Sequence, residues 1–174
     1  MSIVTAALVN HILAGYSLPI GGIHGAPHWA RVMENGRALA KASGADLDVV
    51  ELFAVFHDSR RRNESVDWGH GKRGGAFARE LHGLEFELDA ARLALLELAC
   101  DRHTAGQTTA DLTVQVCWDA DRLDLLRVGT RPRPQLLCTV AARSQDMIDW
   151  ANRRASHREV PDLVRDEWGL DLKP

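Results

Sequence analysis

The sequence predicts an all-α protein on three observations. Apolar residues recur at helical spacing along most of the chain. Glycine and proline divide these stretches into units of helical length. Serine or aspartate, the residues that cap helix N-termini, stand before several of these units. No segment is assigned to a strand.

The composition indicates one ordinary globular domain, which we expect to span residues 1–174. Of the 174 residues, 45% are hydrophobic and 26% are charged, and the formal net charge is −3. This length allows a core large enough for independent folding. The near-neutral balance argues against nucleic-acid binding. Three widely spaced cysteines without a CxxC pair argue against a disulfide framework and favour a reducing, cytoplasmic location.

The first thirty residues contain no Asp, Glu, Lys or Arg. They lack the basic region of a signal peptide, and their apolar run is shorter than the ~20 residues of a transmembrane helix. Apolar residues at helical spacing predict a helix over about residues 3–14, which glycine and proline then end. We expect this helix to pack on the core and not on a membrane, because its polar face has no Lys or Arg.

The next two helices precede a polar segment. Pro27 suits the first turn of a helix that runs from near His28 to about Ala42. Residues 47–56 are almost wholly apolar, which also fits a buried strand, but Asp46 as a cap and the helical neighbours favour a buried helix that ends at His57. The polar, glycine-rich residues 59–75 predict a loop.

The second half continues the helical pattern. The expected helices cover about residues 76–82, 88–102 and 109–127, the last with a break near Trp118. Two prolines make residues 130–134 a stiff connector. In the charged tail we expect a solvated helix capped by Ser144 and a short turn that starts near Pro161.

Histidines stand at the ends of these predicted elements, where side chains can point into a shared cleft. The histidines concerned are His28, His57, His70 and His103. Two aspartates, Asp58 and Asp121, also stand at the ends of predicted elements. Imidazole and carboxylate together suit Mn, Fe, Zn, Co or Ni. An ionised Asp58 next to an apolar helix costs free energy unless it is paired or metal-bound. In the competing interpretation His57 caps a helix end and Asp58 begins a turn.

These segments resemble the HD superfamily of metal-dependent phosphohydrolases, whose pattern is a first His, an adjacent His-Asp pair, optional further His residues and a late Asp. The matching segments lie within residues 28–128 and read HWARV, LFAVFHDSRR, DWGHGKRGG, CDRHTAG and WDADRLDL. The resemblance implies an HD-like helical bundle with the metal site between helices. Residues 28–128 would then form the motif core, and the helices at 3–14 and 144–172 would be extensions.

The resemblance also implies the ligands. The four positions that match the family's four-ligand site are His28, His57, Asp58 and Asp121. His70 and His103 match the dinuclear branch, in which they hold a second metal and Asp58 bridges the two. The implied cofactor is a divalent transition metal, two ions of Mn, Fe, Co or Ni, with Zn also compatible. In the alternative with one metal, His70 is a loop residue and His103 caps its helix.

Two further residues compete for places near this site. Asp119 is an alternative to Asp121, but the Ala-Asp-Arg-Leu context favours Asp121 and leaves Asp119 to orient a ligand. His24 lies four residues before His28, although Gly25 and Pro27 argue against a shared helix face. We expect His24 to act as a substrate contact or proton donor.

The predicted function is a metal-dependent phosphohydrolase, a phosphomonoesterase or phosphodiesterase. It would act on a small phosphorylated metabolite or nucleotide through a hydroxide that the metal makes available at neutral pH. Arg61 and Lys72 are the predicted phosphate ligands, which act in catalysis with Asp58, and Arg73 is a further substrate contact. For each of these cations a solvated loop is the plainer interpretation.

Two other functions would use the same cleft. Some HD-fold proteins with this six-ligand arrangement are diiron oxygenases, and a non-catalytic sensor could bind a nucleotide there. Family members that hydrolyse (p)ppGpp carry acidic residues where this chain has Arg60, Arg61 and Arg62, which argues against that substrate. No Gly-Tyr-Pro signature follows His103, which argues against the cyclic-di-GMP branch. The sequence leaves the oligomeric state open, a homo-oligomer included.

Overall fold

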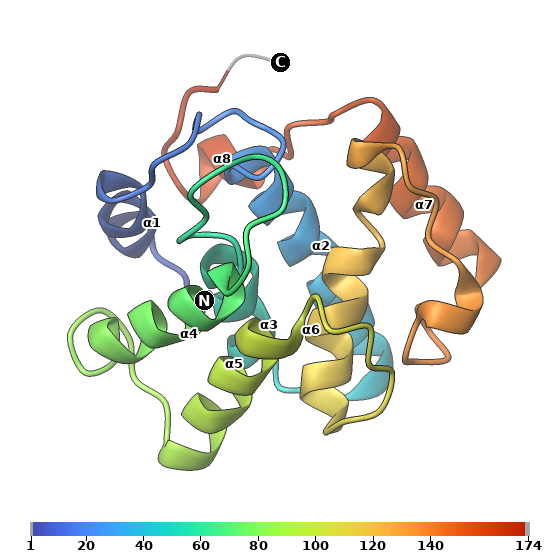
Figure 1. The fold of residues 1–174 in the computed structure, drawn as a ribbon, viewed down its shortest axis with the longest axis horizontal. Helices are drawn as coiled ribbons and strands as arrows, with labels where there is room; N and C mark the ends of the chain where they lie inside the picture. The colour runs from blue at the N-terminus through green and yellow to red at the C-terminus, as the bar shows by residue number, and fades with distance from the viewer. Residues whose placement is uncertain (1, 173–174) are drawn as a thin grey trace.

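The computed structural model describes residues 2–172, and within that range the chain is all-helical (Figure 1). The α-helices are α1 (Ala6–Ala14), α2 (Ala26–Ser43), α3 (Leu47–Phe56), α4 (His70–Leu81), α5 (Ala90–Arg102), α6 (Leu112–Arg122), α7 (Gln145–Ser156) and α8 (Leu163–Asp166). Two short 3₁₀-helices, η1 (Leu125–Val128) and η2 (Pro134–Leu136), lie between α6 and α7. The predicted fold class is therefore confirmed.

Helix α3 lies at the centre of the packing, against α2, α5 and α6. Its residues from Val49 to Phe56 are all buried, which explains the near-continuous apolar run. The carboxylate of Asp46 accepts a hydrogen bond from the backbone N–H of Val49, as expected for an N-cap. The helix interpretation of this segment is confirmed, and the strand alternative is wrong.

Helix α4 corrects the prediction of a loop over residues 59–75, because the helix already begins at His70. Its glycines lower helix propensity, which made the segment read as a loop. They are needed for close packing: a Cβ at Gly71 would lie 2.1 Å from the carbonyl oxygen of Cys100, and one at Gly74 would lie 2.3 Å from that of Phe56. Glycine thus lets α4 approach both α5 and the end of α3.

Helix α6 corrects a second prediction, since it has no break near Trp118 and ends at Arg122 instead of continuing to residue 127. The indole of Trp118 is buried and donates a hydrogen bond to the carbonyl oxygen of Ala99, which fastens α6 to α5. After α6 the chain tightens into η1, whose C-cap Gly129 has a left-handed conformation.

The charged tail is less solvated than its composition suggests. Ser144 caps α7 as predicted, with its hydroxyl accepting from the backbone N–H of Met147. One face of α7 buries Ile148 and Ala151, and Trp168 beyond α8 is fully buried. In Figure 1, α7 lies on the opposite side of α6 from α4 and α5. Within residues 2–172 no helix combines the length and apolar character that a bilayer crossing requires.

Candidate metal centre

Side chains from five stretches of the chain meet in one buried cluster. They come from α2, the turn after α3, the start of α4, the residue after α5, and α6. The cluster consists of His28, His57, Asp58, His70, His103 and Asp121, each at most 9% exposed. The structure therefore brings together all six residues predicted as metal ligands, although their role as ligands stays a prediction.

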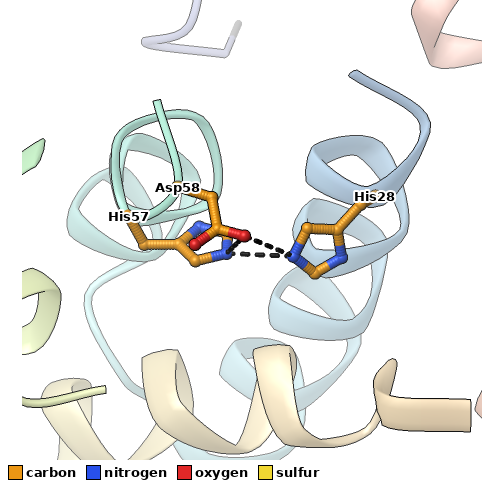
Figure 2. Close-up of side chains that lie close together, drawn as sticks. All are labelled: His28, His57 and Asp58. Carbon is orange, nitrogen blue, oxygen red and sulfur yellow. Dashed lines mark hydrogen bonds and ion pairs between the residues drawn. The ribbon is translucent and has the colours of Figure 1, made fainter. Parts of the chain in front are cut away.

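The first half of the cluster surrounds the paired imidazoles of His28 and His57, whose Nε2 atoms are 3.1 Å apart. Figure 2 shows both rings turned toward each other and toward Asp58, with His28 on α2 and the other two at the end of α3. Asp58 Oδ2 lies 3.6 Å from His28 Nε2 and 3.9 Å from His57 Nε2. Asp121 Oδ1 approaches the same two atoms, at 3.4 and 3.7 Å.

The second half lies on the other side of Asp58. His70 Nε2 and His103 Nε2 are 3.0 Å apart, and Asp58 Oδ1 lies 3.1 Å from the first and 3.7 Å from the second. Asp58 thus presents one carboxylate oxygen to each pair of histidines. Two groups of three donors, each close enough to hold a metal ion, share this aspartate.

The proton positions on the first pair follow from what the remote ring nitrogens contact. His28 Nδ1 is 2.7 Å from a carboxylate oxygen of Asp124, and His57 Nδ1 is 3.1 Å from the carbonyl oxygens of both Phe53 and Ala54. These oxygens only accept hydrogen bonds, so each Nδ1 carries a proton and donates it. In the neutral ring each Nε2 then holds a lone pair directed into the cluster.

The second pair is held in the same tautomer. His70 Nδ1 is 2.7 Å from the carbonyl oxygen of Asp67, and His103 Nδ1 is 2.7 Å from that of Cys100. When both rings are neutral, each half of the cluster therefore holds two nitrogen lone pairs facing each other at about hydrogen-bond distance. Such pairs repel unless a cation lies between them, and imidazole nitrogens with carboxylates form a donor set suited to transition metals.

The buried oxygen Asp121 Oδ1 is further evidence for a bound cation, because it has no hydrogen-bond partner within residues 2–172. Burial of an unpaired carboxylate oxygen costs free energy, which a cation at this place would remove. The residues present thus fit a metal ion in their number, protonation and donor chemistry.

Electrostatics favour the deprotonated forms that a metal requires at His57, Asp58 and Asp121, whereas at His103 the neighbouring carboxylates outweigh burial and raise the pKa. Burial lowers the pKa of His57 to about 3, so its imidazole is neutral. Burial raises the pKa of Asp58, but the neighbouring histidines, His57 first among them, outweigh it and hold this pKa well below its ordinary value. The pKa of Asp121 is likewise lowered, because the neighbouring His28 and His57 and the guanidinium of Arg127 outweigh the effect of burial.

Asp124 is a functional residue that the sequence reasoning missed. Its Oδ2 accepts from His28 Nδ1, and the guanidinium of Arg31 donates to both of its carboxylate oxygens at 2.7 and 3.0 Å. The carboxylate is 1% exposed and fixes the orientation of the His28 ring. A signal was present in the sequence, since Asp124 follows Asp121 by three residues in the WDADRLDL segment.

Asp119 corrects the expectation that this residue orients a ligand. Its carboxylate accepts hydrogen bonds from the backbone N–H groups of Cys138 and Thr139, at 2.7 and 2.8 Å, and from the Thr139 hydroxyl at 2.8 Å. Asp119 therefore fastens the segment after η2 onto α6. Within residues 2–172 its side chain makes no hydrogen bond or ion pair with the histidine cluster, and it serves the fold.

Two of the predicted substrate contacts lie beside the cluster. His24 Nδ1 is 2.8 Å from Asp58 Oδ2. The guanidinium of Arg61 places NH1 3.5 Å from Asp58 Oδ1 and 3.2 Å from His70 Nε2. Its NH2 donates to the carbonyl oxygen of Ser65 at 2.6 Å, which fixes its position.

The other two predicted contacts have different surroundings. Lys72 is exposed and lines a groove between α4 and α5 together with Glu97 and Asp101. Arg73 donates to both carboxylate oxygens of Asp67 at 2.7 Å. Because α4 begins at His70, these two side chains follow the helix surface instead of a loop that bends toward the cluster. Their roles in substrate binding stay predictions.

Comparisons with known proteins bear on the fold. No protein-family model matches the chain, and no curated protein matches it. A crystal structure described as a predicted HD superfamily hydrolase, from an uncultured Thermotogales bacterium, is similar with a TM-score of 0.64 and 27% sequence identity. The likeness covers 87% of this chain and 85% of that chain. This chain has the HD-superfamily fold.

The resemblance inferred from the sequence motifs is thereby confirmed. In the HD-superfamily fold of this chain, the buried histidine–aspartate cluster lies between helices, where a metal ion would be held. The HD fold and this cluster together indicate a metal-dependent hydrolase.

Proposed function

We propose that this chain is a metal-dependent phosphohydrolase that acts on a small phosphorylated metabolite or nucleotide. The single observation that carries the proposal is the environment of Asp58. Its two carboxylate oxygens each face a pair of histidines, and the guanidinium of Arg61 stands at the same place. A site that can hold cations and that has an arginine directed into it suits an anionic, tetrahedral phosphoryl group.

The residues that would hold metal divide into two sets around Asp58. The first ion would be held by His28, His57, Asp58 and Asp121, and the second by Asp58, His70 and His103. When bound, divalent metals supply Lewis acidity, which lowers the pKa of water toward neutrality and neutralises phosphoryl oxygens.

The protein's own residues then orient the donors and the substrate. Asp124 holds the His28 ring in the tautomer that directs Nε2 inward. Arg61, fixed by the Ser65 carbonyl, donates its NH1 hydrogens to a phosphoryl oxygen. His24 lies next to Asp58, and its protonated Nδ1 donates a hydrogen bond to this carboxylate.

We also propose a cytoplasmic location, supported by the cysteines. Cys100, Cys117 and Cys138 are free and buried, so the fold does not use disulfides among them. This usage suits a reducing compartment.

The test combines elemental analysis of the purified chain with hydrolysis of p-nitrophenyl phosphate under nitrogen, with Mn or Co supplied. The proposal expects bound transition metal and phosphate release that needs no O₂. Asp58→Asn should abolish both, whereas Asp166→Asn, an exposed substitution on α8, serves as the matched control and should leave both unchanged.

Two results would overturn the proposal. Substrate-dependent O₂ uptake without phosphate release would show an oxygenase. Tight nucleotide binding without turnover under any metal would show a sensor.

A further inference from the structure

A groove lined by four arginines shares Arg61 with the surroundings of the histidine–aspartate cluster. Its volume is about 300 Å³, and its lining includes the guanidinium-bearing residues Arg60, Arg61, Arg62 and Arg73. Ser17 and Phe77 complete one wall, and Glu80 is the one acidic residue in the lining. The groove is therefore strongly cationic in a chain whose formal net charge is −3.

Within residues 2–172, two of these cations form no close ion pair with a carboxylate. Arg73 is paired with Asp67, and Arg61 faces Asp58. Within residues 2–172, the hydrogen bonds of the Arg60 guanidinium go to neutral carbonyl oxygens, those of Ile12 and Ser59. Arg62 is exposed and forms no ion pair within the same range, since only its backbone N–H is engaged, by Asp67.

Arg60 is held rigidly in this uncompensated state. Its guanidinium lies over the Phe77 ring at 3.5 Å from the ring centroid, which adds a cation–π contact. Burial lowers the pKa of Arg60, and the charge of Glu80 only partly opposes this effect. A half-buried cation that stacks on an aromatic ring and bonds only to carbonyls keeps its charge available for an anion.

Arg61 is common to the groove and to the proposed reaction site. This one side chain both lines the groove and places NH1 3.5 Å from Asp58 Oδ1 and 3.2 Å from His70 Nε2. A substrate whose reacting phosphoryl group lay at Asp58 would reach the groove by extending past Arg61. Arg60 and Arg62 would then meet the part of the substrate that does not react.

We propose that this groove binds a second phosphate group of the substrate. The substrate class is therefore a molecule with at least two phosphates, such as a nucleoside diphosphate or triphosphate or a bisphosphorylated metabolite, in preference to a monophosphate. The assignment of the reacting phosphate rests on the proposed function, whereas anion binding in the groove does not. Each guanidinium offers forked donors that match phosphate oxygens.

The experiment measures anion binding to the full chain by isothermal titration calorimetry. The protein is stripped of metal with EDTA and then dialysed, and the probes are inorganic triphosphate and orthophosphate. We expect triphosphate to bind at least about tenfold more tightly, because it can contact more than one guanidinium with charge-assisted bonds. Equal affinity for the two anions would contradict the proposal.

Variants locate the binding in the groove. Arg62→Gln should weaken triphosphate binding about tenfold, as should Arg60→Gln, while Arg165→Gln, an exposed arginine on α8, should change nothing. Because Arg60 packs on Phe77 and its variant can lose stability, the exposed Arg62 gives the decisive result. Unchanged triphosphate affinity in Arg62→Gln would overturn the groove as the binding place.

The same experiments separate this inference from the proposed function. Triphosphate binding that depends on Arg62, together with no phosphate release from any substrate, would uphold the groove and overturn the hydrolase. Hydrolysis of p-nitrophenyl phosphate without preferential triphosphate binding would uphold the hydrolase and overturn the groove.

Discussion

The two halves of the histidine–aspartate cluster have the same tautomers but different charges around them. The half built on His28 and His57 is approached by two carboxylates, those of Asp58 and Asp121. Among residues 2–172, Asp58 is the one carboxylate within 4.0 Å of the His70 and His103 Nε2 atoms, and the guanidinium of Arg61 lies beside this half. The first half therefore carries more negative charge toward a metal ion.

Because of this difference in charge, we expect the two metal positions to differ in their affinity for a divalent cation. At an effective dielectric constant of 20, two unit charges 4 Å apart interact by about 4 kcal/mol, so a nearby guanidinium weakens binding of a divalent cation substantially. Arg61 NH1 lies 3.2 Å from His70 Nε2, whereas the nearest arginine of the first half, Arg127, keeps its NH2 3.9 Å from Asp121 Oδ1. We expect the first half to bind its ion more tightly.

The largest expected effect comes from the residue that the two halves share. Asp58→Asn keeps the size of the side chain but removes its charge from both halves, so we expect loss of both ions and of all turnover. Mass spectrometry of metal content after dialysis checks this, with circular dichroism as the control for folding. Retention of two ions per chain by this variant would show that Asp58 does not bridge.

Next in size is the loss of one ion from the weaker half. His103→Ala removes one of the two histidines that face Asp58 Oδ1, and it keeps all four donors of the first half, although it removes a ring that packs against His57. We expect about one ion per chain in place of two, with an intact helical spectrum, because the site is built on preformed helices. If the variant still holds two ions, the division of the cluster into two halves is wrong.

The centre was predictable from the sequence to the extent that its residues stand in fixed local patterns. Two such patterns indicated candidate ligands: the adjacent pair His57 and Asp58 after an apolar helix, and Asp121 in its Ala-Asp-Arg-Leu context. The role of Asp124 could not be read in the same way, because it depends on contact with His28, 96 residues away. Sequence spacing shows which residues are near each other on one helix and not which helices touch.

The two main errors have the same physical origin. Glycines in α4 lower helix propensity, yet tertiary packing against Cys100 and Phe56 requires them, so the helix forms where local preference favours a loop. Asp119 looked like a partner for a ligand because it stands two residues before Asp121. On a helix such residues face in different directions, and Asp119 meets the backbone at Thr139 instead.

Asp119 and Asp121 lie on the same helix but are expected to have different roles, Asp119 in stability and Asp121 in metal binding, and this difference can be tested. Asp119→Ala leaves the buried N–H groups of Cys138 and Thr139 without their acceptor. We expect a loss of about 3 kcal/mol in the free energy of unfolding by urea, since buried hydrogen bonds to a charged group are worth ~1.5–3 kcal/mol each. The metal content of the folded protein should stay unchanged.

The exposed helical residue Asp149 gives the matched control for this prediction. Its side chain accepts a hydrogen bond from Gln145, one helical turn away, so Asp149→Ala should change stability by less than about 0.5 kcal/mol. A fall in metal content in Asp119→Ala, with stability unchanged, would return Asp119 to the role of orienting a ligand.

The smallest expected effect tests the asymmetry of the two halves directly. Arg61→Gln removes the positive charge next to His70 while keeping a polar side chain of similar length, so the second ion should bind about tenfold more tightly. Isothermal titration calorimetry of the metal-free protein with Co measures the affinities of the first and second metal ions separately. Turnover of phosphate substrates should fall at the same time, because the same guanidinium is proposed to hold the phosphoryl group.

The neighbouring Arg62 makes the comparison decisive. It is exposed, and its backbone N–H donates to Asp67, outside the cluster, so Arg62→Gln should leave both metal affinities unchanged. If both variants tighten the second ion equally, the effect is one of overall charge and not of the guanidinium at His70. If neither does, the two halves differ for a reason other than Arg61, and the single carboxylate of the second half is then the remaining cause.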